Sequence, residues 1–311
     1  MKKKIFIDGK AGTTGLRIYE RLSGREDIEM ILLSDDERKD PIARKKALNG
    51  CDIAFLCLPD DAARESVSMI ENDNVVVIDT STAHRTLEGW CYGFPELSVD
   101  LDEKLQSAKR IAVPGCHASG FIALVKPLID AGYISTDALL TCHSITGYSG
   151  GGKKMIAEYE DLDRDPLLDA PRQYGITQTH KHLKEMQKIT GLDNAPVFCP
   201  IVSDFYSGMM VTVPLFASQL KDGITIEDLK ALYQNKYNGE IVKYDPEFAD
   251  NGFISAAKLK DSDAMRVTVA GNDDRILLIA VYNNLGKGAS GAAVECMNVV
   301  LGQDKKCALD I

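Results

Sequence analysis

The sequence predicts an α/β protein made of a Rossmann-type dinucleotide-binding domain and an α+β domain with a mixed, largely antiparallel sheet. Three observations carry this prediction. The first third of the chain alternates short apolar runs with helical periodicity, a glycine-rich turn follows the first of these runs, and longer β-rich runs begin after residue 137. With 311 residues, of which 45% are hydrophobic, the chain is long enough for two domains.

The expected strands of the first domain are short and apolar. They are residues 4–8, 28–33, 51–58, 75–79 and 110–113. Between the first two we expect a helix with Leu16, Tyr19 and Leu22 on one face. Short apolar strands that alternate with helices are typical of a parallel sheet covered by helices.

The second domain is expected to be richer in strands. Its strands are predicted at residues 138–146, 209–215, 266–270 and 275–282. The turn Gly271-Asn272-Asp273-Asp274 predicts a hairpin between the last two, so strands here should pair antiparallel. A helical pattern over 289–301 is expected to return to the first domain. We therefore assign residues 1–115 and 286–311 to the dinucleotide-binding domain, and residues 116–285 to the catalytic and oligomerisation domain.

Composition excludes several classes of protein. A net charge of -10 without a basic tract argues against nucleic acid as a partner. The apolar runs are far shorter than the roughly 20 residues that cross a bilayer, and the basic start leads directly into a strand, so we expect no membrane segment and a cytoplasmic location. Eight cysteines without CxxC pairing argue against a zinc ribbon or a disulfide framework and suit a reducing compartment.

A glycine-rich turn at the first strand-to-helix junction predicts a phosphate-binding site. The first strand leads into Gly9-Lys10-Ala11-Gly12-Thr13-Thr14-Gly15, and a helical pattern follows. Glycine lets the backbone approach a pyrophosphate, and the helix N-terminus supplies N–H donors and a favourable dipole. Gly9, Gly12, Thr13, Thr14 and Gly15 are therefore predicted to bind a dinucleotide. The alternative is a tight turn without a ligand.

The segment after the second expected strand bears on the choice of cofactor. An NAD-preferring site usually carries an acidic residue here for the ribose hydroxyls, whereas an arginine nearby accommodates a 2′-phosphate. The segment Ser34-Asp35-Asp36-Glu37-Arg38-Lys39 contains both kinds of residue. We predict NADP, bound through Ser34 and Arg38. The alternative is a solvated charged loop.

A cysteine stands where the strand over 110–113 gives way to a helical pattern. The segment is Pro114-Gly115-Cys116-His117-Ala118-Ser119-Gly120. A thiol in the first turn of a helix ionises more easily, and the exposed N–H groups there can hold the oxyanion of a carbonyl that the sulfur attacks. Cys116 is therefore a candidate nucleophile. The alternative is a buried structural thiol at a tight turn.

Together these features resemble the N-acetyl-γ-glutamyl-phosphate reductases in their shorter form, a family of the aspartate-semialdehyde dehydrogenase-like superfamily. The resemblance covers essentially the whole chain. It rests on the glycine turn, on Pro114-Gly115-Cys116, and on the segments Gly147-Tyr148-Ser149-Gly150-Gly151-Gly152-Lys153, His180-Lys181-His182 and Asn283-Asn284-Leu285-Gly286-Lys287-Gly288-Ala289. The His-x-His segment followed by Glu185 favours this family over the aspartate-semialdehyde dehydrogenases, which place their histidine later in the second domain.

The resemblance implies a reaction in arginine biosynthesis. Cys116 attacks N-acetyl-L-glutamyl 5-phosphate, expels phosphate and forms a thioester, which NADPH reduces to N-acetyl-L-glutamate 5-semialdehyde. Among the five histidines it favours His180 for acid–base catalysis, with His182 as a substrate contact. Residues two apart in a helix point about 200° apart, so only one of the two histidines is expected to face the Cys116 sulfur. Which of the two faces it stays open. No third ligand accompanies the pair, so a metal site is not expected.

The leaving phosphate also has implied contacts. Ser81 and Arg85 belong to the turn Asp79–Arg85, which follows a buried strand and lies at the sheet edge where ligands collect. A guanidinium matches the paired oxygens of a phosphate. The alternative for Arg85 is a surface ion pair with Glu88.

The glycine-rich segment 147–153 is predicted to be a loop, because so much glycine disfavours any regular element. The resemblance implies that Ser149 and Gly150, together with Asn284, contact the cofactor. The alternative is a flexible linker between domains. At Tyr206–Met209 the chain lacks the arginine-glycine pair of longer relatives, so the substrate contacts there stay open.

Two other functions compete with this prediction. One is an aspartate-semialdehyde dehydrogenase, and the other is a non-catalytic protein that senses NADP with the same fold. The expected partners are a small acyl-phosphate substrate and further copies of the chain, as a homodimer or homotetramer.

Overall fold

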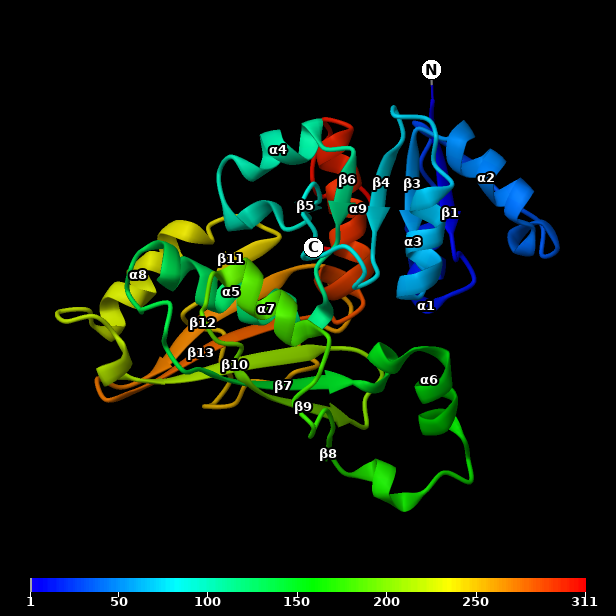
Figure 1. Cartoon of the computed structure of the whole chain (residues 1–311). Coiled ribbons are helices and arrows are strands. Elements are labelled where there is room, and N and C mark those ends of the chain that lie inside the picture. Colours follow the sequence, from blue (N-terminus) through cyan, green and yellow to red (C-terminus); the bar gives the residue numbers. More distant parts are fainter. Residues whose placement is uncertain (1) are drawn as a thin grey trace. The chain divides into compact units, whose positions relative to one another are not determined.

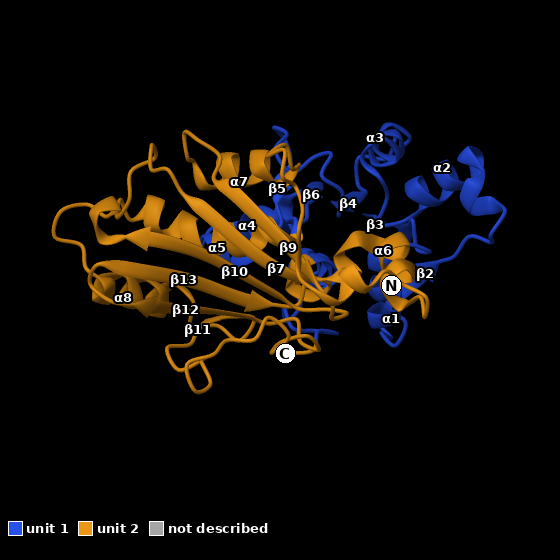
Figure 2. Cartoon of the chain, turned by 90° about the horizontal axis from the view of Figure 1, so that it is seen from below, with its two compact units in different colours: residues 1–115, 289–309 blue, residues 116–288, 310–311 orange. Residues whose placement is uncertain are grey.

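The computed structural model describes residues 2–311 and divides the chain into two compact units (Figure 2). Unit 1 is Met1–Gly115 with Ala289–Leu309, and unit 2 is Cys116–Gly288 with Asp310–Ile311. The sequence placed the second boundary at 286 and the whole C-terminus in the first domain. The last two residues instead belong to unit 2, where Asp310 N–H donates to the Asp263 carboxylate and Asp263 N–H to the Asp310 carbonyl.

Unit 1 contains a six-stranded sheet in the order β2-β1-β3-β4-β6-β5, in which every pair is parallel. Its strands are β1 (Lys3–Asp8), β2 (Ile28–Ile31), β3 (Ile53–Leu56), β4 (Val76–Asp79), β5 (Cys91–Tyr92) and β6 (Arg110–Ala112). The predicted parallel sheet is confirmed. Only β5 was missed, because a two-residue strand shows no periodicity.

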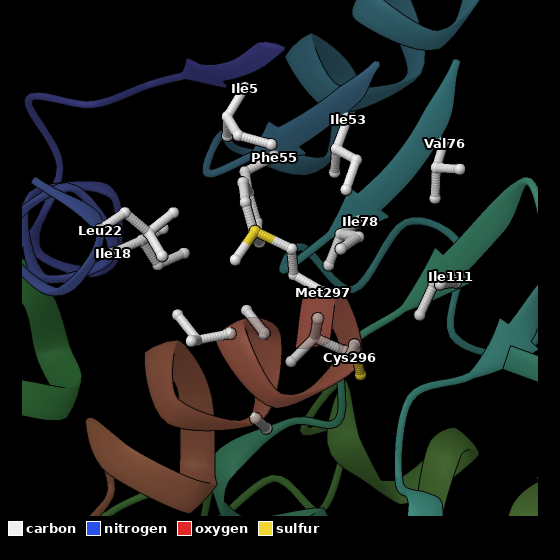
Figure 3. Packing of buried hydrophobic residues seen from close by; sticks show 14 of the residues in the cluster. Ile5, Ile18, Leu22, Ile53, Phe55, Val76, Ile78, Ile111, Cys296 and Met297 are labelled. Carbon is white, nitrogen blue, oxygen red and sulfur yellow. The ribbon is translucent and has the colours of Figure 1, made fainter. Parts of the chain in front are cut away.

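Helices cover both faces of this sheet. They are α1 (Thr13–Leu22), α2 (Pro41–Gly50), α3 (Asp60–Ser68), α4 (Leu101–Ser107) and α9 (Gly291–Val300). On one face Ile5, Phe55 and Ile78 pack with Ile18 of α1 and Met297 of α9 (Figure 3). On the other face alternate strand residues pack with α2 and α3.

The predicted apolar face of α1 was partly wrong. The buried positions are Gly15, Ile18 and Leu22, whereas Leu16 is 44% exposed. Ile18 and Leu22 are four residues apart and so lie on one stripe of the helix.

Unit 2 contains a seven-stranded mixed sheet in the order β11-β12-β13-β10-β7-β9-β8. Its strands are β7 (Thr141–Gly147), β8 (Arg172–Gln173), β9 (Val197–Ser203), β10 (Met209–Phe216), β11 (Val242–Tyr244), β12 (Met265–Gly271) and β13 (Arg275–Tyr282). Pairing is antiparallel except for β7 with β9 and β11 with β12, and the predicted hairpin joins β12 to β13. The sequence missed β8, β9 and β11. Strands β8 and β11 have only two and three residues, and Pro200 disguises the pattern of β9.

The helices of unit 2 are α5 (Cys116–Asp130), α6 (Gly152–Glu160), α7 (His182–Thr190) and α8 (Ile226–Lys236). Helix α5 is almost wholly buried and contacts β10, β13, α7 and α8 (Figure 1). The opposite face of the sheet is less covered. Along β10, Val211 and Val213 are buried, whereas Phe216 on the opposite face is 62% exposed.

The segment 147–153 is not the irregular loop that its glycines predicted. A 3-10 turn spans Tyr148–Gly151 and α6 begins at Gly152. The backbone before α6 is fixed by hydrogen bonds, because the N–H groups of Gly147, Tyr148 and Ser149 donate to the carbonyls of Gly208, Phe205 and Tyr206. Within residues 2–311, every helix is too short or too polar to cross a bilayer.

Candidate functional site

The glycine turn of unit 1 is a close approach of backbone segments. Gly9 has a φ of +86°, and a Cβ on it would lie 2.3 Å from the Cys57 carbonyl oxygen. A Cβ on Gly15 would lie 2.5 Å from the Gly9 carbonyl oxygen, and Gly12 N–H donates to that same oxygen. Because α1 begins at Thr13, the five predicted residues gather at the N-terminus of a ten-residue helix.

A cavity of about 360 Å³ lies beside this turn and is lined entirely by residues of unit 1. Its wall includes Gly9, the apolar side chains of Leu16 and Leu58, and the cations Lys10, Arg38 and Arg44. Glycines that leave no room for a Cβ, a helix N-terminus and cations around a cavity match the needs of an anionic dinucleotide. The residues present therefore fit the predicted cofactor.

Of the two predicted residues Ser34 and Arg38, Arg38 lines this cavity and Ser34 does not. Arg38 lines it and pairs with Asp35 at 3.2 Å, and both side chains are largely exposed. Ser34 is not among the lining residues. Its Oγ accepts from Glu37 N–H and its own N–H donates to the Glu37 carboxylate, which lowers the pKa of Glu37. The segment contains the 3-10 turn Glu37–Lys39 and all of its residues are exposed, so the alternative of a solvated charged loop stays open.

The turn after β4 is organised around a buried carboxylate. Asp79 accepts from the Ser81 N–H at 2.9 Å and from the Ser81 hydroxyl at 2.7 Å, and lies 2.6 Å from His84 Nδ1. The His84 ring stacks on Trp90 with centroids 4.0 Å apart. Ser81 is therefore held through Asp79, and the fixed rings make this turn rigid.

Arg85 is buried, with 8% of its surface exposed, so the surface-pair alternative is wrong. Its Nε donates to the Val113 carbonyl at 2.8 Å and its Nη2 to the Thr80 carbonyl at 2.9 Å. Arg85 thereby ties the turn after β4 to the end of β6, close in sequence to Cys116.

Cys116 is the first residue of α5, where the sequence placed it. The Tyr282 hydroxyl donates to the Cys116 carbonyl and accepts from Gly120 N–H at 3.0 Å. A Cβ on Gly288 would lie 3.1 Å from the Cys116 Cβ. The backbone of this cysteine is therefore confined from two sides.

Three histidines of unit 2 form a cluster that we call the histidine cluster: His117, His180 and His182. Their ring centroids lie 5.8, 5.6 and 4.7 Å apart. The helical argument that separated His180 from His182 was wrong, because α7 begins at His182 and His180 precedes it. Both rings therefore lie beside His117.

Hydrogen bonds fix the state of two members of the cluster. His117 Nδ1 lies 2.7 Å from the Ser144 hydroxyl and its Nε2 lies 2.6 Å from the Tyr174 hydroxyl. Burial, and secondarily the neighbouring His180, lowers the pKa of His117 to about 3, so this ring is neutral near pH 7. His180 Nδ1 accepts from the His182 N–H at 3.2 Å, which leaves its proton on Nε2. Burial lowers the pKa of His180 as well.

Tyr174 belongs to the same surroundings as Cys116. Burial raises the pKa of Tyr174, and the negative charge that Cys116 carries as a thiolate raises it further. The Tyr174 hydroxyl therefore stays protonated and acts as a neutral hydrogen-bonding group.

Asn284 holds two other segments of unit 2 together. Its Nδ2 donates to the Ser149 hydroxyl at 3.0 Å and its Oδ1 accepts from Gly208 N–H at 2.9 Å. A Cβ on Gly150 would lie 3.4 Å from the same Nδ2. The structure thus brings the predicted residues Ser149, Gly150 and Asn284 together, and the segment 206–209 joins them through Gly208.

Two further observations concern the other thiols and the possible metal ligands. Burial raises the pKa of Cys51 and Cys57 to about 12, as expected for core thiols. Across residues 2–311, no group of three or more His, Cys, Asp or Glu side chains is arranged to hold a metal ion.

Sequence reasoning missed the partners that hold these groups. They are Asp79 and His84 in unit 1, and Ser144, Tyr174 and Tyr282 in unit 2. Ser144 and Tyr282 lie on strands and differ little from ordinary strand residues. Only the position of Tyr174, six residues before His180, offered a hint in the sequence.

Two family models match the chain and define its class. The semialdehyde dehydrogenase NAD binding domain matches residues 4–104, and the semialdehyde dehydrogenase dimerisation domain matches residues 116–284. The dinucleotide turn and the cysteine at the start of α5 fall in these two parts. The fold and the site thus define a protein of the semialdehyde dehydrogenase class.

Curated relatives narrow the class to one family. The chain is 42% identical to N-acetyl-gamma-glutamyl-phosphate reductase 2 of Nostoc sp. over 99% of both chains. It is 46% identical to N-acetyl-gamma-glutamyl-phosphate reductase of Chelativorans sp. over 97% of this chain and 99% of the relative. The chain belongs to the N-acetyl-gamma-glutamyl-phosphate reductase family.

Solved structures share the fold at low identity. Aspartate semialdehyde dehydrogenase II from Vibrio cholerae, complexed with ASA, superimposes with a TM-score of 0.73 at 16% identity and covers 97% of this chain and 99% of its own. Aspartate semialdehyde dehydrogenase with NADP from Candida albicans gives a TM-score of 0.65 at 15% identity, over 99% of this chain and 100% of its own. These likenesses establish the architecture alone.

Proposed function

We propose that this protein reduces N-acetyl-L-glutamyl 5-phosphate to N-acetyl-L-glutamate 5-semialdehyde and phosphate with NADPH, in arginine biosynthesis. The observation that carries the proposal is a cysteine at the first position of a buried helix, beside three clustered histidines. The curated relatives of the chain are N-acetyl-gamma-glutamyl-phosphate reductases over nearly their full length. Thiolate nucleophiles and titratable imidazoles are what acyl transfer from a phosphate requires.

Cys116 is the proposed nucleophile. It gives its proton to a histidine, the thiolate adds to the acyl carbon, and the bond from that carbon to the phosphate oxygen breaks. The proton then leaves with the phosphate, and a thioester stays on the enzyme. N–H groups in the first turn of α5 stabilise the oxyanion. NADPH, when bound, would supply a hydride to the thioester carbon. Release of the semialdehyde from Cys116 then breaks the carbon–sulfur bond and leaves a thiolate, which takes up a proton.

Acid–base catalysis is proposed for the pair His180 and His182. The sequence favoured His180, but its Nδ1 accepts the His182 N–H and its proton stays on Nε2. This hydrogen bond suits His180 as a donor to the substrate and favours His182 for moving the proton. His117 is neutral and bound on both nitrogens, so it positions Tyr174 and Ser144 and does not titrate near pH 7.

NADPH is proposed to bind unit 1, as a dinucleotide-binding domain. Gly9, Gly12, Thr13, Thr14 and Gly15 would hold the pyrophosphate, with Arg38 and Ser34 at the 2′-phosphate. For the nicotinamide end we retain the predicted contacts Ser149 and Gly150, with Asn284 fixing Ser149 from behind. Unit 2 is proposed as the catalytic domain.

Ser81 and Arg85 are proposed to form the site of the leaving phosphate. Arg85 is already bound to two backbone carbonyls, so it acts by fixing the turn and offers its remaining N–H groups to the anion. Ser81 is fixed by Asp79.

We propose a homo-oligomer, with a homodimer as its unit, built on the sheet face of unit 2 opposite α5. This face includes the exposed side chains of Val197, Phe216 and Leu277, and residues of the same face pair directly across β10 and β13. The match of residues 116–284 to a dimerisation domain supports this choice of partner. The eight cysteines, none of them in a disulfide within the described residues, suit a reducing cytoplasm.

The test is phosphate-dependent reduction of NADP by N-acetyl-L-glutamate 5-semialdehyde, measured in parallel with aspartate semialdehyde. Turnover with the first substrate is expected to exceed turnover with the second by at least about 100-fold, since a site built for a polar group rejects an analogue that lacks it. Activity on aspartate semialdehyde alone would overturn the substrate assignment. Cofactor binding without turnover on either would favour a sensing protein.

A further inference from the structure

A tyrosine hydroxyl bonds to the first turn of α5, directly at the proposed nucleophile. In a regular α-helix the N–H of residue 120 would bond directly to the carbonyl of residue 116. Here the Tyr282 hydroxyl, at the end of β13, donates to the Cys116 carbonyl and accepts from Gly120 N–H at 3.0 Å. The Tyr282 hydroxyl thus contacts both the acceptor and the donor of this helical bond, and α5 is helical from Cys116 onward.

The sequence makes room for this hydroxyl. A Cβ on Gly120 would lie 2.7 Å from the Tyr282 hydroxyl oxygen and 2.8 Å from the Val211 Cβ. Glycine is otherwise unfavourable inside a helix by up to about 1 kcal/mol relative to alanine. Gly120 and Tyr282 are therefore complementary, and the hydroxyl occupies space that any other residue at 120 would fill.

The same C-terminal segment of unit 2 confines Cys116 from a second side. Gly288 follows Tyr282 by six residues, and a Cβ there would lie 3.1 Å from the Cys116 Cβ and 3.4 Å from its Cα. The hydroxyl thus fixes the carbonyl of Cys116, while the backbone at Gly288 limits its Cβ. These two contacts restrict the direction in which the thiol can point.

We propose that Tyr282 is a positioning residue for the nucleophile, whose hydroxyl sets the backbone of Cys116 and so the place of its sulfur. The inference rests on the proposed function of Cys116. Burial raises the pKa of Tyr282, so the hydroxyl remains a donor at every working pH. Without it, the Cys116 carbonyl loses this donor, and the peptide that carries the sulfur is held less firmly.

The test compares Tyr282→Phe with Tyr237→Phe as a matched control. Tyr237 is equally buried and its hydroxyl also donates to a carbonyl of α5, that of Ala123 at 2.7 Å. Ala123 lies seven residues beyond Cys116, about two helical turns away. Both variants thus lose one tyrosine hydroxyl from the same helix, and only one of them loses it at the nucleophile.

Tyr282→Phe is expected to lower kcat by about 10- to 100-fold with little change in KM, because a small displacement of a reacting atom has effects of this size. Alkylation of Cys116 by iodoacetamide, located by mass spectrometry, should change in rate and in its pH profile. Tyr237→Phe should leave kcat and alkylation unchanged, with at most a lower Tm.

Other outcomes are equally decisive. Equal losses of Tm in both variants, with unchanged kcat and alkylation, would give Tyr282 a purely structural role and overturn the inference. If the wild-type protein shows no turnover but the alkylation of Cys116 still depends on Tyr282, the proposed function fails and the positioning of the thiol stands. Should Tyr282→Phe not fold, Gly120→Ala displaces the Tyr282 hydroxyl, because its Cβ would lie 2.7 Å from that oxygen, and must alter alkylation. An unchanged rate there contradicts the inference.

Discussion

The glycine turn of unit 1 and the cysteine site of unit 2 solve different chemical problems with different parts of the chain. In the turn, the backbone provides the site: Gly9 and Gly15 leave no room for a Cβ, and α1 begins at Thr13, so its first N–H groups lie at the turn. At the cysteine site, side chains provide it: His117 is buried, Tyr174 is half-buried, and the two are hydrogen-bonded to each other and shifted in pKa.

This difference separates binding from chemistry. Substitutions that displace the backbone of the turn should alter cofactor affinity, because we propose that this backbone holds the cofactor. Changes at the cysteine site should alter the rate, because titratable groups are gathered there around the proposed nucleophile. This separation is wrong if a change at the glycine turn alters the rate without altering cofactor affinity, or if a change at the cysteine site alters cofactor affinity.

The largest effect is expected from Cys116→Ser. Removal of the covalent nucleophile should lower kcat by at least about 10⁴-fold, while the dissociation constant of NADPH stays the same. Steady-state kinetics and fluorescence titration of NADPH measure the two properties. Cys199→Ser, on β9, is the control and should retain activity. Full activity in Cys116→Ser would rule out covalent catalysis.

Gly9→Ala should have the next largest effect. The φ of +86° and the approach to the Cys57 carbonyl make alanine strained, so we expect a loss of about 3 kcal/mol in the free energy of unfolding and weaker NADPH binding. Chemical denaturation and NADPH titration measure these. The control is Gly24→Ala, because nothing lies within 4 Å of a Cβ there. Equal stability of the two variants would contradict the close approach.

His117 should make stability depend on pH. Its pKa is about 3 in the folded protein and near 6.5 when unfolded, so the unfolded chain binds more protons between these values. The contribution of His117 to the free energy of unfolding is therefore complete above pH 6.5 and falls on acidification, by about 2 kcal/mol at pH 5. Denaturation at several pH values measures it. His117→Gln should flatten this slope, and an unchanged slope would show that His117 is not the group responsible.

The smallest effect is expected from Arg38→Ala. Loss of the guanidinium should weaken NADPH about tenfold and leave NADH nearly unchanged, because only NADPH carries the 2′-phosphate. Calorimetric titration of both cofactors measures this. Arg64→Ala is the control, since Arg64 forms a similar surface pair with Asp61 but does not line the cavity. Equal weakening of both cofactors would place Arg38 away from the 2′-phosphate.

Local features of the chain were predictable from the sequence, and partnerships between distant residues were not. The glycine turn and the position of Cys116 depend on a strand, a turn and a helix that follow one another within about 20 residues, and periodicity detects such units. The short strand β5 and the proline-containing β9 escaped because they depend on neighbouring strands for their definition.

The partners of the site residues escaped for the same reason. Tyr282 and Cys116 are 166 residues apart in the chain, and Asn284 and Ser149 are 135 apart. No local pattern encodes such contacts. The error over His180 and His182 came from assuming one continuous helix, whereas α7 begins only at His182.

Helix α9 has a consequence for the order in which the protein is built. Its side chains complete the core between β1, β3 and β4 of unit 1, although more than 170 residues separate it from Gly115. During translation, all strands of unit 2 are therefore synthesised before α9 can cover the sheet of unit 1. Until then the exposed apolar side of that sheet is open to aggregation, and a nascent chain in this state is the kind that chaperones protect.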